Sequence, residues 1–477
     1  MNKNQPDKKK FSFGCKDQVI SNLEKNFVYR YTNCFKVYRR DNTPTAANYF
    51  NALIACEKGK ANMERMEEEI PYSDYRAYQH FISNSKWDHK ELIGRVSRDA
   101  SALMAKNKTD KGFATGYIID ESAHLKKGVG SVGTAKQYAG VAGKVENCQV
   151  GVYASLVNDN RATIINAKIF LPETWTKSKS KCDKAGVPEG ERVFRTKPEL
   201  ALEMVDRDLA NGVSFDWVGG DGLYGHSFEL TEGLNKRGVF YVLDVHRDEL
   251  VFKEMPKIEV PKKKPGSKGR PPKSPKPNAG PVRLDNYLES LGPKGFETVK
   301  VRKTAKGWLK LKVHVSTVWI WNKSSNTLSE RALVITKTTG KKTEVKYSFS
   351  NGSQDQYTPK EYAYFQAQRY WVERTFDDSK NELGMSDYQI RKWIGWHHHM
   401  SLVITAGLFL LEEKMLHDKD LPLMSTRDAR QLMIVFFFGT EEQKETRIRQ
   451  MIERHKKRKA DIDRRYRYQE IEEILLK

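Results

Sequence analysis

Two acidic residues of this 477-residue sequence each follow a short apolar run. Asp120 comes directly after Tyr117-Ile118-Ile119, and Asp221 comes directly after Val218-Gly219-Gly220. Such runs are typical of buried strands, so each carboxylate is expected where a strand ends. On neighbouring strands the two carboxylates would repel each other without a cation. Their oxygens suit Mg²⁺ or Mn²⁺, and two such ions about 4 Å apart can activate a water or a 3′-hydroxyl against a phosphodiester.

This chemistry requires a third carboxylate, and helix geometry selects one from the acidic stretch near residue 375. The candidates are Glu373, Asp377, Asp378 and Glu382. At about 100° per residue, Arg369, Glu373 and Lys380 fall within about 40° of one helix face, whereas Glu382 points to the opposite side. We therefore predict Glu373 as the third ligand. The alternative is an ordinary i,i+4 ion pair between Arg369 and Glu373.

Other polar residues compete for a role in this site. Asp216 lies five residues before Asp221, which is roughly 17 Å along a strand, whereas Asp244 is expected near the end of a core strand in a supporting position. The consecutive residues His397, His398 and His399 diverge by about 100° on a helix, so they indicate a polar helix start rather than a zinc site.

The composition predicts a folded protein with a polyanionic partner. Lys plus Arg number 83 and Asp plus Glu number 61, so the net charge is 83 − 61 = +22. This excess favours nucleic acid as the partner. The five scattered cysteines never form a CxxC pair, which fits a reducing cytosol. The first ten residues lack the apolar stretch of a signal peptide, and the longest uncharged apolar run, 401–411, is too short to span a membrane.

The order of predicted elements is that of a ribonuclease-H-like α/β fold. Helical spacing over 16–107 is followed by strands at 117–119, 150–157 and 162–171, a helix at 198–209, a strand at 213–218, a helix at 227–237 and a strand at 239–245. In such a mixed sheet the strands before Asp120 and Asp221 are neighbours. Strict alternation over 297–349 then predicts an antiparallel β insertion, and the chain is helical after Pro359.

Seven segments are expected from these patterns. They are a disordered basic tail (1–15), a helical DNA-binding domain (16–108), the first part of the catalytic core (109–252), a basic proline-rich linker (253–290), the β insertion (291–358), the second part of the core with Glu373 (359–415) and a charged helical region (416–477). In the linker, Gly269-Arg270-Pro271 is similar to the minor-groove core of an AT-hook, or it belongs to a solvated polybasic loop.

Four stretches together resemble bacterial insertion-sequence transposases of the DDE type. They are IIDESAHLKKG with Asp120, GSVGTAKQYAGVAGKVENCQVGVYASL, GDGLYG with Asp221, and RYWVERTFDDSKNELGMSDYQIRKWIGWHHHMSL with Glu373. The resemblance covers about residues 75 to 411. It implies a ribonuclease-H-like core, interrupted by a β-rich insertion before the third acid. It also implies DNA nicking at element ends, joining of 3′-hydroxyls to target DNA, and a homodimer on DNA in the bacterial cytoplasm, associated with the nucleoid.

The resemblance also implies roles for individual residues. The family signature around its glutamate is Tyr-x2-Arg-x3-Glu-x6-Lys, which this sequence matches at Arg369, Glu373 and Lys380 but not at Gln366. Tyr364 or Tyr370 could replace the missing tyrosine. Arg369 and Lys380 would hold DNA phosphates. Further DNA contacts are expected from Lys126, Lys127 and Arg270, and base stacking from Trp371, Trp319 or Trp321, unless these tryptophans are core residues.

Two other functions use the same residues. A hydrolytic nuclease on the same core would cleave without joining strands. A transposase-derived DNA-binding regulator would keep the acids without activity.

Overall fold

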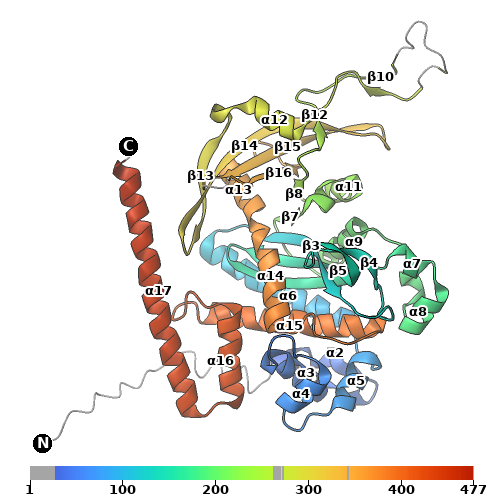
Figure 1. Cartoon of the computed structure of the whole chain (residues 1–477), viewed down its shortest axis with the longest axis vertical. Helices are drawn as coiled ribbons and strands as arrows, with labels where there is room; N and C mark the ends of the chain where they lie inside the picture. The colour runs from blue at the N-terminus through green and yellow to red at the C-terminus, as the bar shows by residue number, and fades with distance from the viewer. Residues whose placement is uncertain (1–26, 262–269, 271–272, 341–342, 476–477) are drawn as a thin grey trace, which may run out of the picture. The chain divides into compact units, whose positions relative to one another are not determined.

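A computed structural model describes residues 27–261, 270, 273–340 and 343–475. The chain divides into two compact units (Figure 1). The first comprises the described residues up to Leu92, together with Asp378–Gln389 and His398–Asp461. The second comprises Ile93–Asp377, Ile390–His397 and the described residues from Ile462 onward. Each unit is therefore built from segments far apart in the sequence. The segment at 1–15 lies outside the described residues.

The second unit is built on a ten-stranded mixed sheet in the order β13-β14-β15-β16-β8-β7-β3-β5-β4, with β6 also paired to β5. The strands are β3 (Gly116–Leu125), β4 (Ala135–Ala139), β5 (Lys144–Asn158), β6 (Arg161–Ile169), β7 (Trp217–Gly220), β8 (Tyr241–Val245), β13 (Glu297–Thr304), β14 (Gly307–Asn322), β15 (Thr327–Thr338) and β16 (Val345–Ser350).

The order β6-β5-β3-β7-β8 within this sheet is the expected ribonuclease-H-like core. β3, β5 and β6 pair antiparallel in succession, and β3-β7-β8 pair parallel. The strand before Asp120 is therefore a direct neighbour of the strand before Asp221. The predicted α/β class with a mixed sheet and a β insertion is confirmed.

The β insertion continues the core sheet. Its strands β13 to β16 form an antiparallel meander, and β16 pairs antiparallel with β8 through Phe349 opposite Leu243. Helix α12 (Leu284–Leu291) covers this part of the sheet (Figure 1). Its side chains Leu284 and Tyr287 pack in one cluster with Leu333 and Phe349 of the sheet. The insertion and the core strands consequently form one continuous surface.

The remaining elements of the second unit are mainly helices. The helices are α6 (His89–Lys111), α7 (Glu173–Thr176), α8 (Lys179–Ala185), α9 (Lys197–Ala210), α10 (Gly222–Gly225), α11 (Phe228–Lys236), α13 (Pro359–Gln368) and α14 (Tyr370–Glu382); α6 begins in the first unit. Two short ladders pair β9 (Leu250–Val251) with β12 (Val282–Arg283) and β10 (Ile258–Glu259) with β11 (Lys276–Pro277). Helix α13 starts with a capping box, in which Thr358 and Glu361 satisfy each other's backbone donors. It packs against β13 and β14, and so leads the chain from the insertion into α14.

Two local predictions differ from the structure. The strand predicted at 213–218 is the shorter β7, because the N–H of Val213 donates to the carbonyl of Asp208 and extends the turn that ends α9. The segment predicted as a linker ends in α12, because the apolar side chains of Leu284 and Tyr287 are buried against the sheet. The alternating apolar spacing of the insertion gave no signal for this covering helix.

The first unit is helical, with an aromatic core. It contains α2 (Thr32–Phe35), α3 (Thr43–Ala55), α4 (Met63–Glu69), α5 (Tyr75–Ser83), most of α15 (Trp393–Leu416), α16 (Thr426–Phe438), most of α17 (Glu441–Leu475) and the short ladder β1 (Lys36–Val37) to β2 (Arg40–Asp41). Phe27, Phe50 and Phe409 pack against one another at ring-centroid distances of 5.2 to 6.0 Å. The expected charged C-terminal helix is α17.

The consecutive histidines lie in the first turns of α15 and are all buried. The ring of His398 stacks on Trp87 at 3.8 Å, and its two nitrogens lie 2.9 and 3.1 Å from the carbonyls of Ile82 and Trp87. The histidines thus lie near the start of a helix, as expected, and their side chains are core residues.

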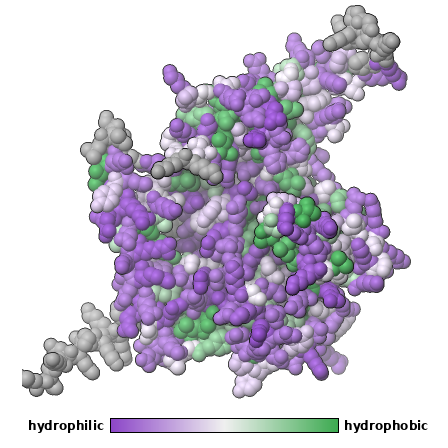
Figure 2. Space-filling view, in the orientation of Figure 1, coloured by the Kyte–Doolittle hydropathy of each residue, from purple (hydrophilic) through white to green (hydrophobic). Residues whose placement is uncertain are grey.

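Helix α15 is long and apolar enough by composition to cross a membrane. However, 89% of its apolar window is buried inside the protein, as in the core helix of a folded domain. The face drawn in Figure 2 is predominantly hydrophilic, with small separate apolar patches. This surface agrees with the high content of charged residues.

Candidate active site

Asp120 and Asp221 lie at adjacent positions of the central sheet. Ile119 of β3 pairs with Gly220 of β7, and each aspartate is the next residue along the chain. Asp221 directly follows the end of β7, as expected. The expectation that Asp120 also ends a strand is wrong, because β3 continues to pair with β5 as far as Leu125. Asp221 is also the N-cap of α10, and its side chain accepts a hydrogen bond from the N–H of Leu223 at 3.0 Å. Carboxylate oxygens of Asp120, Glu121 and Asp221 all lie within 4.8 Å of one another. The sequence prediction that the two aspartates converge agrees with this geometry.

Glu121, the third member of this cluster, was missed by the sequence reasoning. Its two carboxylate oxygens are engaged by Lys197, 2.6 Å away, and by the hydroxyl of Tyr224, which donates to it at 3.0 Å. The only sequence signal was its position directly after Asp120. Successive residues of a regular strand point to opposite faces, so the pattern gave no reason to expect both side chains in one cluster.

The carboxylate cluster is electrostatically costly by itself. Burial and the neighbouring charge of Asp221 raise the pKa of Asp120 to about 7, although Arg369 opposes this change. Burial and the same three acids raise the pKa of the Tyr224 hydroxyl well above its ordinary value. Closely spaced carboxylate oxygens are the donor set that Mg²⁺ and Mn²⁺ prefer, and a divalent cation would remove the repulsion. The residues therefore fit the divalent metal that the chemistry requires.

Arg369 links this cluster to the neighbouring helices. It lies at the junction of α13 and α14. Its guanidinium is 3.0 Å from Asp244, 3.4 Å from Glu373 and 3.7 Å from Asp120, measured between the nearest nitrogen and oxygen atoms. Burial lowers the pKa of Arg369, but these carboxylates outweigh burial and the net shift is upward. Arg369 therefore holds a positive charge between three acids.

Glu373 lies in the first turns of α14, on the same face as Arg369, as the helix geometry predicted. Its side chain is 58% exposed, and it is not a member of the carboxylate cluster. The i,i+4 ion pair that was the alternative explanation is present, but Arg369 also contacts Asp120 and Asp244. Glu373 therefore reaches the cluster through Arg369.

Asp244 supports Arg369 from the last core strand. Its side chain is 15% exposed and accepts a hydrogen bond from Ser348 Oγ at 2.7 Å. The Nε–H of Arg369 is not directed at the nearby oxygen of Asp244, so their contact is an ion pair rather than a hydrogen bond. Burial raises the pKa of Asp244, against the opposing effects of Arg369 and Ser348.

Gln366, which stands at the family's tyrosine position, continues this network. It is buried, its amide donates to Ser348 Oγ at 2.6 Å, and it accepts from Thr336. Tyr364 is buried too, with its hydroxyl near the backbone of Ala114 and Asp159. Tyr370 is 48% exposed. Of the two tyrosines left open as replacements, the exposed Tyr370 is the one available to a ligand.

The predicted DNA-binding residues occupy different surroundings. Lys126 is half-buried and burial lowers its pKa to about 8, whereas Lys127 is exposed in the turn after β3. Arg270 is exposed and is flanked by residues outside the described ranges. Lys380 is half-buried in the part of α14 that belongs to the first unit.

Asp216, the acid that competed with Asp221, lies at the other end of β7. Its side chain pairs with Lys108 and accepts a hydrogen bond from the N–H of Thr115.

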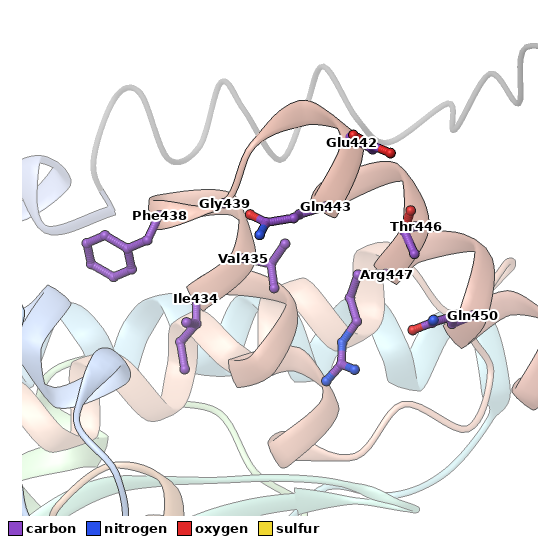
Figure 3. A pocket seen from close by; sticks show the side chains of 9 residues that line it. All are labelled: Ile434, Val435, Phe438, Gly439, Glu442, Gln443, Thr446, Arg447 and Gln450. Carbon is purple, nitrogen blue, oxygen red and sulfur yellow. The ribbon is translucent and has the colours of Figure 1, made fainter.

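A hollow in the first unit is separate from these residues. It has a volume of about 540 Å³ and lies between α16 and α17 (Figure 3). Its lining consists of Ile434, Val435, Phe438, Gly439, Glu442, Gln443, Thr446, Arg447 and Gln450. A single carboxylate among mostly apolar and amide side chains gives it no metal-binding character.

Comparison with known proteins gives two matches. The chain is similar to a protein of Microchaete diplosiphon described as "probable transposase for insertion sequence element IS701", with 22% identity over 360 residues that cover 72% of this chain and 76% of that protein. Residues 30–307 match the family described as DDE superfamily endonuclease. This range contains Asp120 and Asp221 and ends before Glu373. Because it covers more than half of the sequence, the chain belongs to the DDE superfamily of endonucleases.

Proposed function

We propose that this protein is a DNA transposase that binds the ends of its element, cleaves phosphodiesters there and joins the freed 3′-hydroxyls to target DNA. The observation that carries this proposal is the convergence of Asp120 and Asp221 from neighbouring parallel strands. Membership in an endonuclease family gives DNA as the substrate, and the similarity to an insertion-sequence transposase favours transposition over simple hydrolysis.

Asp120, Asp221 and Glu373 are the proposed ligands of Mg²⁺ or Mn²⁺, with two ions as the expected number. When bound, such ions activate a water or a 3′-hydroxyl and stabilise the leaving oxygen of the phosphodiester. The protein holds Asp221 in place through its capping bond to α10, and Asp120 through its position beside β7. Arg369 is expected to orient Glu373 toward the cluster and to contact a DNA phosphate.

Glu121 is proposed as a positioning residue. Its oxygens are already bound by Lys197 and Tyr224, so it connects α9 and α10 to the strand that carries Asp120. Tyr224 stays protonated at neutral pH, since burial and the nearby acids raise the pKa of its hydroxyl. It can therefore keep donating to Glu121 throughout the reaction.

The remaining roles follow from charge and from the family. Lys126, Lys127, Arg270 and Lys380 are proposed DNA contacts, and the N-terminal helices are proposed to bind the terminal repeats. Two element ends must be paired, so we expect a homodimer on DNA. The segment boundaries are retained as proposals, except that the linker ends before α12. The expected location is the bacterial cytoplasm at the nucleoid.

The proposal is tested with purified full-length protein and labelled linear DNA that carries the element's own ends, in Mg²⁺ or EDTA. Wild type is compared with Asp221→Asn and with Asp216→Asn, an acid at the opposite end of the same strand. We expect metal-dependent nicks at the element boundary that are lost in Asp221→Asn and retained in Asp216→Asn. Joined products would identify a transposase, and nicks without joining a hydrolytic nuclease. Binding without cleavage would contradict the proposal and identify a regulator.

A further inference from the structure

Arg302 of the β insertion packs against two adjoining aromatic rings of the helix that carries Glu373, and these rings lie 5.2 Å from each other between centroids. Its guanidinium carbon lies 5.3 Å from the ring centroid of Tyr370 and 5.2 Å from that of Trp371. These two residues directly follow Arg369 in the chain. A guanidinium packed on aromatic faces has its position fixed by cation–π attraction while its N–H groups stay available along the edge.

Within the described ranges, Arg302 forms no salt bridge with a carboxylate, and Asp159 acts on its charge only from a greater distance. Its Nε–H is buried without a hydrogen-bond acceptor, and the indole N–H of the adjoining Trp371 is likewise unpaired. Burial lowers the pKa of Arg302, which Tyr370 and Asp159 only partly oppose. Arginine nevertheless stays protonated in proteins. A fixed, partly desolvated cation with unused donors is well suited to an anionic ligand.

The backbone of β13 is irregular at this residue. Lys300 pairs with Lys310 but Arg302 pairs with Leu309, so Val301 is an extra residue on this strand. A β-bulge of this kind turns the following side chain relative to a regular strand and is frequent beside active sites. Val301 is buried, and Arg302 reaches the rings at the start of α14. The bulge therefore accounts for how an insertion strand can bring a cation to the catalytic helix.

Further cations and aromatic rings surround Arg302. Lys303 lies over the rings of Trp308 and Tyr466, at 5.6 and 5.5 Å. The hydroxyl of Tyr466 bonds the backbone of Thr304 and Gly307, which fixes the end of α17 to this hairpin. Tyr370 remains 48% exposed. Arg302 thus lies in a positively charged region that is partly accessible to a ligand, and the contacts of Tyr466 hold this region in place.

We infer that Arg302 binds a backbone phosphate of the DNA that enters the carboxylate site, with Tyr370 and Trp371 holding its guanidinium in place. This inference rests on the proposed function, because it requires DNA at that site. It assigns the β insertion a direct part in substrate binding through a residue outside the family signature. A phosphate is favoured over a base because the buried Nε–H of Arg302 is without an acceptor, and charged N–H donors of arginine match the oxygens of a phosphate.

The test measures binding of the full-length protein to a labelled DNA duplex of about 40 base pairs in EDTA, over 50 to 200 mM salt. Loss of one phosphate contact lowers the slope of log K against log salt by about 0.9 and the affinity roughly five- to tenfold near 100 mM salt. We expect this result for Arg302→Gln. Arg302→Lys keeps the charge but not the planar fork, so it is expected to keep the slope and bind more weakly.

Lys323→Gln is the matched control, because Lys323 is an exposed cation in the turn between β14 and β15. Equal loss of slope in Lys323→Gln and Arg302→Gln would show a diffuse charge effect and overturn the inference. Thermal unfolding of each variant is measured in parallel, and a lower midpoint with unchanged affinity and slope would give Arg302 a purely structural role. Cleavage plays no part in this assay, so failure of the catalytic proposal is seen separately. A wild-type protein that does not bind the duplex would overturn both proposals.

Discussion

Replacing Asp244 by asparagine tests whether Arg369 must be held in place for cleavage. The substitution keeps an acceptor for Ser348 but removes the negative charge that lies 3.0 Å from Arg369. At an effective dielectric constant near 20, that charge attracts the guanidinium by about 332/(20 × 3.0), or about 5.5 kcal/mol before desolvation. Asp120, at 3.7 Å, contributes a comparable attraction, whereas Glu373 is 58% exposed and its contribution is weaker.

Without the charge of Asp244, the balance of forces draws Arg369 toward Asp120. A displacement of about 1 Å at a reacting centre can cost up to about a hundredfold in rate. We therefore expect Asp244→Asn to lower the cleavage rate roughly 10- to 100-fold. The free energy of unfolding is expected to fall by about 1 to 3 kcal/mol. This is less than the roughly 3 to 5 kcal/mol of a buried charge left unpaired, because Asp120 and Glu373 still pair with Arg369. Binding of element ends in EDTA is expected to change little.

Asp208→Asn is the control for a general loss of stability. Asp208 is fully buried and accepts from the hydroxyl of Tyr117 and the amide of Asn166, away from Arg369. Its substitution is expected to cost a similar unfolding free energy, about 1 to 3 kcal/mol, and to leave the cleavage rate within about twofold. Cleavage rates are measured at saturating Mg²⁺, and stability by urea unfolding. Equal loss of cleavage in both variants, or full cleavage by Asp244→Asn, would refute the positioning role.

Three further predictions concern separate parts of the protein. Glu121→Gln is expected to slow cleavage less than tenfold, because Lys197 and Tyr224 occupy its oxygens; a loss as complete as that of Asp221→Asn, measured as initial rate, would make Glu121 a ligand. Gly225→Ala would place a Cβ 2.0 Å from a backbone carbonyl oxygen, whereas the Cβ of Gly190→Ala meets open space. In urea unfolding, Gly225→Ala is expected to destabilise the protein by about 1 to 3 kcal/mol, and Gly190→Ala by less than about 0.5 kcal/mol. Burial lowers the pKa of His398 to about 4, from an unfolded value near 6.5. The unfolded chain therefore binds the proton first as the pH falls. The stability that is present above pH 6.5 is lost as the pH falls toward 4, by about (6.5 − 4) × 1.36, or about 3 kcal/mol. A wild type and a His398→Gln variant with the same pH dependence of unfolding would contradict this last prediction.

The sequence by itself determined the class of fold and the position of its two central acids. Apolar runs followed by Asp120 and Asp221 were visible as strands, and the βββαβαβ order specified their neighbour relation, since parallel pairing of such strands leaves few topologies. Helical spacing placed Arg369 and Glu373 on one face, because rotation per residue is a local property. These features depend on the periodicity of strands and helices, which the spacing of apolar and charged residues along the sequence shows directly.

The tertiary structure decided which side chains from distant segments meet. Glu121 joins the carboxylate cluster, Gln366 bonds across two insertion strands, and Asp244 reaches Arg369. The sequence did not distinguish Arg302 from the other cations of the insertion. A bulge in β13 and the packing of the start of α14 bring it against the rings of Tyr370 and Trp371. Such contacts depend on register and on the packing of helices on the sheet, and neither leaves a periodic signal in the sequence.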